Sequence, residues 1–157
     1  MRLGNFTGIK GFPNQDIAMW ESMEPMAERR GLAFEGDAQA LLGVQVNGDA
    51  MRLRQILMNL LGNAIKFTER GEVRLAVQLS DGGAGIVFEV TDTGPGITVE
   101  QQARLFERFE QADGPRTASR FGGSGLGLAI CQELAVALGG RIGVQSRPGQ
   151  GACFRVE

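Results

Sequence analysis

The chain has 157 residues, 43% of them hydrophobic, and a net charge of −2, which fit one cytosolic globular domain and argue against a general nucleic-acid binder. It contains no histidine, so Ser–His–Asp and Cys–His catalysis, histidine-ligated zinc and a phosphohistidine of its own are all excluded. Cys131 and Cys153 form no metal-ligand spacing and no disulfide framework, and no apolar run approaches the roughly 18 residues of a membrane span.

The first predicted element follows a glycine- and proline-containing segment with little periodicity. We interpret residues 1–15 as a linker and residues 16–157 as one domain. Apolar residues recur at helical spacing from Ile17 to Arg30, and Gly31 is a natural helix stop. Two short strands are expected next, over Leu32–Phe34 and Gly43–Val46.

The clearest element is a helix from Ala50 to about Thr68, with Asp49 as its N-cap. One face is an apolar stripe, made of Leu53, Ile56, Leu57, Leu60, Leu61, Ala64 and Phe67. Another face is polar, made of Arg52, Gln55, Asn59, Asn63 and Lys66. Asparagine is a poor helix former, so Asn59 and Asn63 indicate either a solvated, hydrogen-bonded face or a functional use. An amide oxygen suits Mg²⁺, and a nearby lysine suits a phosphate.

The remaining elements alternate between hairpins and helices. In order they are a hairpin of Val73–Leu79 and Ile86–Val90, a loop of Asp92–Ile97, a short helix over Val99–Phe109, a polar segment of Glu110–Gly123, a helix over Leu126–Leu138 ended by Gly139 and Gly140, and a hairpin of Arg141–Ser146 and Gly151–Val156. This order predicts a two-layer α/β sandwich, with a mixed, mostly antiparallel sheet covered on one face by helices.

Glycine is unusually frequent and unevenly distributed. It occurs 24 times, about twice the number that an average usage of about 7% would give. Seven glycines fall close together, at positions 94, 96, 114, 122, 123, 125 and 127. The segment Gly122–Gly127 runs directly into a predicted helix, which indicates either a phosphate cradle or a plain glycine-rich loop. A P-loop is excluded, because neither Lys10 nor Lys66 has the required context, and a dinucleotide fingerprint is excluded because no strand precedes the glycines.

The loop Asp92–Ile97 also allows two interpretations. An aspartate that ends an apolar strand can accept a hydrogen bond from an exocyclic amine, as adenine presents it. Asp, Gly and Pro are equally the usual residues of a type I or type II turn.

Taken together, these segments resemble four sequence boxes of histidine kinases of the GHKL ATP-binding superfamily. They are the N box at Leu60–Thr68, the first glycine box at Asp92–Ile97, the F box at Leu105–Phe109 and the second glycine box at Gly122–Ile130. The tail Gly139–Phe154 resembles the closing hairpin of the same family. The resemblance implies a Bergerat-type α/β sandwich that binds Mg-ATP between the long helix and a lid, which we place at Glu110–Phe121.

The resemblance also implies roles for individual residues. Asn63 would ligate Mg²⁺ and Lys66 would contact phosphate, with Asn59 lining the same site. The base pocket would be formed by Phe67, Asp92, Gly94, Gly96 and Ile97. The phosphates would be held by Gly123, Gly125, Leu126 and Gly127. Phe106 and Phe109 would anchor the lid, and Arg116 and Arg120 would be its phosphate-contact candidates.

The reaction depends on the residue one helical turn before Asn63. Hydrolytic relatives place a glutamate there, which activates water, whereas Asn59 cannot take a proton. We therefore expect a protein-histidine kinase catalytic domain, which transfers phosphate to a histidine on a separate dimerisation domain of a larger sensor kinase. A degenerate nucleotide-sensing or protein-docking module is the alternative. A serine kinase that acts on an anti-sigma antagonist shares the boxes, but the GLGLAI sequence and the Lys66–Thr68 ending resemble histidine kinases more.

The same resemblance implies the partners and location of the domain. A phosphoacceptor domain of the parent kinase and a downstream response regulator are expected. No nucleic acid and no membrane contact are expected of the domain itself, which should be monomeric in isolation. The location would be cytoplasmic, whether or not the parent sensor is anchored in a membrane.

Overall fold

The computed structural model describes residues 23, 25–37, 48–83, 85–108 and 125–157. Its elements are β1 (Leu32–Asp37), α2 (Ala50–Phe67), β2 (Gly71–Leu79), β3 (Ile86–Asp92), α3 (Val99–Arg104), α5 (Gly127–Ala137), β4 (Ile142–Ser146) and β5 (Ala152–Val156). Residues 25–29 are also helical. The predicted linker over residues 1–15 and the predicted strand Gly43–Val46 lie outside the described residues.

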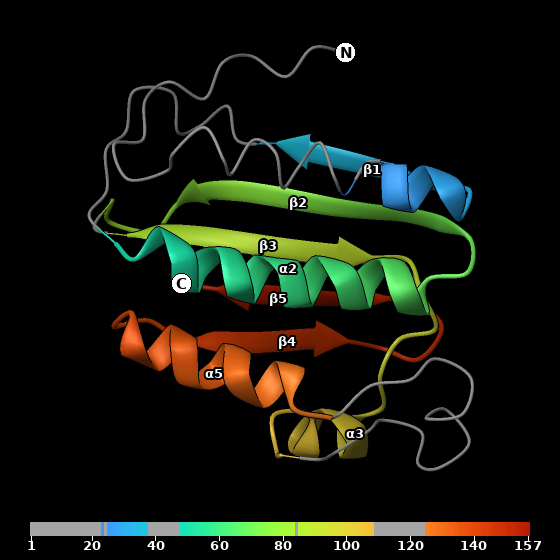
Figure 1. Cartoon of the computed structure of the whole chain (residues 1–157). Helices are drawn as coiled ribbons and strands as arrows, with labels where there is room; N and C mark the ends of the chain where they lie inside the picture. Colours follow the sequence, from blue (N-terminus) through green and yellow to red (C-terminus); the bar gives the residue numbers. More distant parts are fainter. Residues whose placement is uncertain (1–22, 24, 38–47, 84, 109–124) are drawn as a thin grey trace.

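The strands form one five-stranded sheet in the order β1-β2-β3-β5-β4 (Figure 1). β1 pairs with β2 in parallel, and the other three pairings are antiparallel. α2 and α5 lie side by side over one face of this sheet (Figure 1). The predicted α/β sandwich with a mixed, mostly antiparallel sheet is therefore confirmed.

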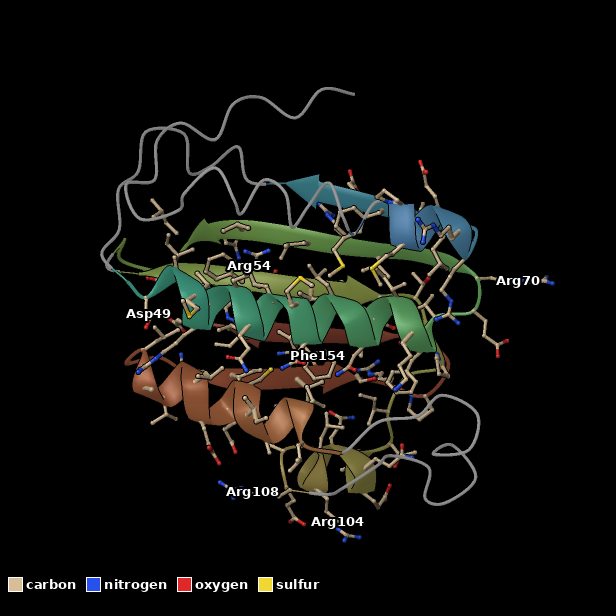
Figure 2. The ribbon with its side chains drawn as sticks, in the orientation of Figure 1. Asp49, Arg54, Arg70, Arg104, Arg108 and Phe154 are labelled. Carbon is tan, nitrogen blue, oxygen red and sulfur yellow. The ribbon has the colours of Figure 1, made fainter. Side chains whose placement is uncertain are left out.

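α2 matches its prediction closely because its N-cap and its apolar periodicity are set by residues close together in the sequence. The Oδ1 atom of Asp49 accepts hydrogen bonds from the backbone N–H groups of Met51 and Arg52, each at 3.1 Å, so the predicted N-cap is confirmed. The buried face of the helix consists of Ile56, Leu57, Leu60, Leu61, Ala64 and Ile65. It packs on sheet residues such as Phe154, which Figure 2 shows beneath the helix.

Phe67 departs from the predicted apolar stripe. Its side chain is 38% exposed, whereas Ile65 is buried instead. Phe67 stands in the last turn at the edge of the buried face, where the Nζ atom of Lys66 lies 4.9 Å from its ring centroid.

Two other boundaries differ from the predictions. The helix expected over Val99–Phe109 ends at Arg104, although it begins with a complete capping box between Thr98 and Gln101. β1 extends to Asp37, three residues beyond the predicted strand, because it pairs along its whole length with β2. The predicted stops are confirmed, since Gly31 and Gly139 both have positive φ, at 68° and 80°.

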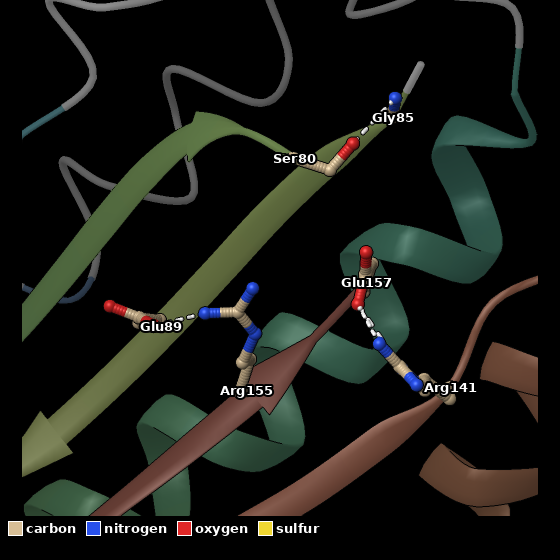
Figure 3. Close-up of polar contacts among 6 residues, drawn as sticks. All are labelled: Ser80, Gly85, Glu89, Arg141, Arg155 and Glu157. Carbon is tan, nitrogen blue, oxygen red and sulfur yellow. Dashed lines mark hydrogen bonds and ion pairs between the residues drawn. The ribbon is translucent and has the colours of Figure 1, made fainter. Parts of the chain in front are cut away.

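The other face of the sheet carries ion pairs. Glu89 lies between the buried Phe88 and Val90 in sequence, so its side chain points away from α2, and it accepts a hydrogen bond from Arg155 of β5 at 3.0 Å (Figure 3). Arg141 and Glu157 form a second ion pair at 2.7 Å at the end of β5 (Figure 3). Among the described residues, no helix is long and apolar enough to cross a membrane.

Candidate functional site

Asp92, the last residue of β3, is anchored by backbone groups on two sides. Its Oδ1 atom accepts a hydrogen bond from the N–H of Gly94 at 2.8 Å, and its carboxylate also accepts from the N–H of Ala152. Burial raises the pKa of Asp92 above its usual value, and these two hydrogen bonds act in the opposite direction. The carboxylate is thus held in place, with acceptor capacity left for a further donor.

The loop that follows Asp92 is bound to the turn between β4 and β5. The N–H of Gly149 donates to the carbonyl of Pro95 at 2.6 Å, and the N–H of Ile97 donates to the Ser146 hydroxyl at 2.8 Å. The Ser146 hydroxyl in turn donates to the carbonyl of Gly151 at 2.6 Å. Two segments more than 40 residues apart are thereby joined at one end of the sheet.

The glycines of this loop are required by close approach of the backbone. A Cβ on Gly96, which has a φ of +73°, would lie 2.0 Å from the carbonyl oxygen of Arg147. A Cβ on Gly94 would lie 2.9 Å from Asp92 Oδ1 and 3.2 Å from the Oγ1 atom of Thr68, the C-cap of α2. We call this end of the molecule the Asp92 corner, formed by Thr68, Asp92–Ile97, Ser146, Gly151 and Ala152.

Asn59, on the polar stripe of α2, faces the start of α5. Asn59, Asn63 and Lys66 are all half-buried. The Oδ1 atom of Asn59 lies 3.5 Å from where a Cβ of Gly127 would be, and the Asn59 side chain is hydrogen-bonded to the thiol of Cys131. We call this region the asparagine face, formed by Asn59, Asn63, Lys66 and Gly125–Gly127.

Cys131 shows how tightly α5 packs on α2. Its side chain is completely buried, and its Sγ atom lies 3.8 Å from the carbonyl oxygen of Ile56. Burial raises the pKa of the thiol to about 11, and the hydrogen bond from Asn59 acts in the opposite direction. The contact fixes Asn59 at the junction of the two helices, beside the first turn of α5.

The predicted site residues therefore separate into four groups. Five of them lie at the Asp92 corner or next to it, at one end of α2: Phe67, Asp92, Gly94, Gly96 and Ile97. The asparagine face holds Asn59, Asn63 and Lys66, and Asn59 contacts the described part of the second glycine box, in which Gly125 has a φ of +68° and Leu126 is the N-cap of α5. Phe106 is half-buried against the core. Phe109, Arg116, Arg120 and Gly123 lie outside the described residues, as does the predicted lid.

Sequence reasoning missed four residues of the Asp92 corner and one residue beside it. The corner residues are Thr68, Ser146, which holds Ile97, and the pair Gly151–Ala152. The residue beside the corner is Arg30, whose guanidinium donates to the carbonyls of Ile65 and Lys66, at 2.9 Å each, and so caps the end of α2. The only local sequence feature that points to Arg30 is its position next to the glycine that ends a helix. Ser146 and Ala152 reach the corner through the pairing of β5 with β3 and β4, and Thr68 is buried by packing against Gly94.

The donor groups fit a magnesium ion that arrives with a phosphate ligand. No group of three or more Cys, Asp and Glu side chains that could hold a metal occurs among the residues described. Asn63 would supply a neutral amide oxygen instead, with Asn59 lining the same site, and Mg²⁺ commonly takes one or two protein ligands and completes its shell with water and substrate phosphates. The residues present thus fit Mg²⁺ as part of a metal–nucleotide complex.

Comparison with known proteins agrees with this geometry. The family model described as histidine kinase-, DNA gyrase B-, and HSP90-like ATPase matches residues 48–157, and a model described as LigXa C-terminal domain like matches residues 1–46. The sensor histidine kinase AruS of Pseudomonas aeruginosa is 55% identical over 108 residues, which cover 67% of this chain and 11% of AruS.

Solved structures share the fold. Full-length ShkA in complex with AMPPNP is 40% identical, with a TM-score of 0.70 over 90% of this chain and 28% of that chain. The nucleotide-free catalytic domain of the histidine kinase ThkA is 25% identical, with a TM-score of 0.74 over 92% of this chain and 90% of that domain.

The class of protein follows from the fold and the matched model together: an α/β ATPase domain. The chain belongs to the histidine kinase-, DNA gyrase B-, and HSP90-like ATPase family, and the kinases it matches are sensor histidine kinases. The resemblance seen in the four boxes is confirmed. The chain spans between 11% and 19% of the length of the curated relatives it matches.

Proposed function

We propose that this domain binds Mg-ATP and transfers its γ-phosphoryl group to a histidine on a separate dimerisation and phosphoacceptor domain. The observation that carries the proposal is the position of Asn59, which lies against Gly127 and Cys131 at the start of α5. A carboxylate there could activate water, whereas an amide cannot take a proton. The site is therefore suited to positioning a phosphoryl group for a nucleophile that comes from elsewhere.

The Asp92 corner would bind the adenine. The carboxylate of Asp92 is already fixed by Gly94 and Ala152, and it would accept a hydrogen bond from the exocyclic amine of the base. Phe67 presents an exposed ring next to this corner, which would pack against the base. Gly96 and Ile97 would line the pocket through their backbone.

The asparagine face would bind the triphosphate. Asn63 would supply an oxygen ligand to Mg²⁺, Lys66 would contact a phosphate, and the backbone N–H groups of Gly125, Leu126 and Gly127 would point toward the anion at the start of α5. Gly123, Phe106, Phe109, Arg116 and Arg120 keep the roles that the family resemblance implies. Bound Mg²⁺ neutralises charge on the phosphates and orients them.

The acceptor must come from another domain, because this chain has no histidine. A nitrogen of the partner's imidazole would attack the γ-phosphorus, the bond to the bridging oxygen would break, and ADP would leave. The phosphohistidine would then supply a response regulator. We further propose that the domain is cytoplasmic and monomeric when isolated.

A reconstituted transfer assay tests the proposal. The chain is incubated with Mg²⁺ and γ-labelled ATP, with and without the histidine-bearing dimerisation domain of a matched kinase such as AruS. Acid-labile label is expected on the partner domain only when both proteins are present. A partner that lacks its acceptor histidine is the control.

Two results would contradict the proposal in different ways. Failure to bind ATP would remove the nucleotide site altogether. Binding of ATP without transfer to any cognate histidine domain would instead identify a nucleotide-sensing or docking module.

A further inference from the structure

The hydroxyl of Thr68 is buried at the edge of the proposed base pocket. Thr68 is 0% exposed, and its backbone N–H donates to the carbonyl of Ala64 as the C-cap of α2. Among the described residues, Oγ1 of Thr68 is the one buried side-chain polar atom with no hydrogen-bond partner. A hydroxyl left in this state destabilises the fold, and valine would fill the same space without that cost.

The Thr68 hydroxyl and the Asp92 carboxylate lie next to the same glycine, Gly94. The point where a Cβ of residue 94 would lie is 3.2 Å from Thr68 Oγ1 and 2.9 Å from Asp92 Oδ1. Both oxygen atoms therefore border the same small space beside the Cα of Gly94. Because residue 94 is glycine, no side chain separates the hydroxyl from the carboxylate.

The carboxylate can use another donor. Asp92 already accepts hydrogen bonds from the N–H groups of Gly94 and Ala152, but an ionised carboxylate has room for about four. A hydroxyl that donates to it would favour its ionised form, as the two backbone groups do. Asp92 Oδ1 lies 2.9 Å and Thr68 Oγ1 lies 3.2 Å from the same point, so the two oxygens are at most about 6 Å apart, and the carboxylate is the nearby acceptor for this hydroxyl.

We propose that Thr68 is a positioning residue for Asp92, and that its hydroxyl donates to the Asp92 carboxylate when nucleotide is bound, which sharpens selection of the base. The inference rests on the proposed nucleotide site. An ionised carboxylate only accepts hydrogen bonds, so it pairs with the amine of adenine and is repelled by the carbonyl oxygen that hypoxanthine and guanine carry at the same position. The third donor keeps Asp92 an acceptor and fixes its orientation.

Competition between two diphosphates tests the inference on the whole chain. ADP and IDP, which differ in the amine and the carbonyl, are titrated in the presence of Mg²⁺ into the wild type, Thr68→Val and Thr68→Ser. The ratio of the IDP to the ADP dissociation constants is expected to fall about tenfold in Thr68→Val, because loss of one hydrogen bond to a charged group changes an affinity by about that factor. Thr68→Ser, which keeps the hydroxyl, should stay within about twofold of the wild type.

The base-selectivity ratio separates positioning from a structural role. If Thr68→Val keeps the wild-type ratio of dissociation constants, whether or not both affinities fall, the inference is wrong while the nucleotide site stands. If the wild type binds neither diphosphate, the proposed function fails and this inference with it. Thermal unfolding checks that Thr68→Val folds. Should it not, Thr68→Ala removes the hydroxyl without adding bulk, and the same loss of selectivity is expected.

Discussion

The Asp92 corner and the asparagine face lie along the same helix, yet they are built in different ways. The corner is held by backbone contacts among the end of α2, the loop after β3 and the turn before β5, so its geometry is part of the fold. The asparagine face consists mainly of polar side chains on a helix whose opposite side is buried. Substitutions in the Asp92 corner should therefore change both ligand binding and stability. Substitutions on the asparagine face should change ligand binding with little effect on stability.

The difference has a physical basis. A nucleobase is planar and is recognised by a few fixed hydrogen bonds, for which a preorganised carboxylate is suited. A triphosphate with Mg²⁺ carries its own charge and most of its own ligands, so neutral oxygens and N–H groups at a helix start are sufficient. Substitutions in the two regions should therefore change different observables.

The largest effect on stability is expected from Gly151→Ala in the corner. A Cβ at Gly151, which has a φ of +74°, would lie 1.9 Å from the carbonyl oxygen of Asp92. Left-handed backbone and overpacking together should lower the free energy of unfolding by about 2–5 kcal/mol, measured by urea titration.

Gly149 is a matched control in the same turn. Its φ is +77°, but a Cβ there would meet nothing within 4 Å. Gly149→Ala should cost only the backbone strain, about 1–2 kcal/mol. Equal losses in the two variants would show that the close approach to Asp92 does not hold the corner.

On the asparagine face, Asn63→Ala should have the opposite profile. Removal of the proposed Mg²⁺ ligand should weaken Mg-dependent ATP binding or transfer by about a hundredfold. The free energy of unfolding should be unchanged or higher by up to about 0.7 kcal/mol, because alanine is the better helix former.

Gln55→Ala is the control for this variant, because Gln55 lies on the same polar stripe, is exposed, and has no proposed role. It should bind nucleotide as the wild type does. If Asn63→Ala unfolded more easily and bound Mg-ATP normally, the contrast between the two regions would be wrong.

This contrast also explains how much could be predicted from the sequence. α2, the two hairpins and the helix stops depend on caps, periodicity and glycines within a few residues, so they were predictable. The parallel pairing of β1 with β2 was not, because Leu32 and Gly71 meet across an intervening helix and no local pattern gives their register.

The site divides in the same way. The asparagine face could be predicted because Asn59, Asn63 and Lys66 follow one another at helical spacing. Ala152 could not, because it reaches Asp92 only through the register of β3 with β5. Nor could Thr68, since a threonine after a helix is common and its burial results from packing against Gly94.

A smaller, pH-dependent effect is expected for Asp92→Asn. Burial raises the pKa of Asp92 in the folded chain above the value of 3.8 that applies when it is unfolded, so the folded form binds the proton more tightly. The contribution of this group to stability is fully present below pH 3.8 and is lost as the pH rises through the raised pKa. The Tm of Asp92→Asn relative to wild type should therefore increase with pH, while its affinity for ADP falls about tenfold.

Glu100→Gln provides the control of opposite sign. Hydrogen bonds from its own backbone N–H and from Thr98 lower the pKa of Glu100, so this group stabilises the fold above its ordinary value of 4.5 and loses that contribution as the pH falls. The Tm of this variant relative to wild type should decrease with rising pH. The same trend in both variants would contradict the assigned cause for Asp92.

The smallest effect is expected from Glu133→Gln, at the end of the molecule where Figure 2 shows Arg104 and Arg108. Glu133 of α5 pairs with Arg108, in the turn after α3, but both side chains are about two-thirds exposed, at 60% and 66%. Exposed pairs of this kind contribute little and are screened by salt. At physiological ionic strength the Tm should change by less than about 2 °C. A larger loss, or a change in ADP affinity, would mean that the segment after α3 couples stability to binding as the Asp92 corner does.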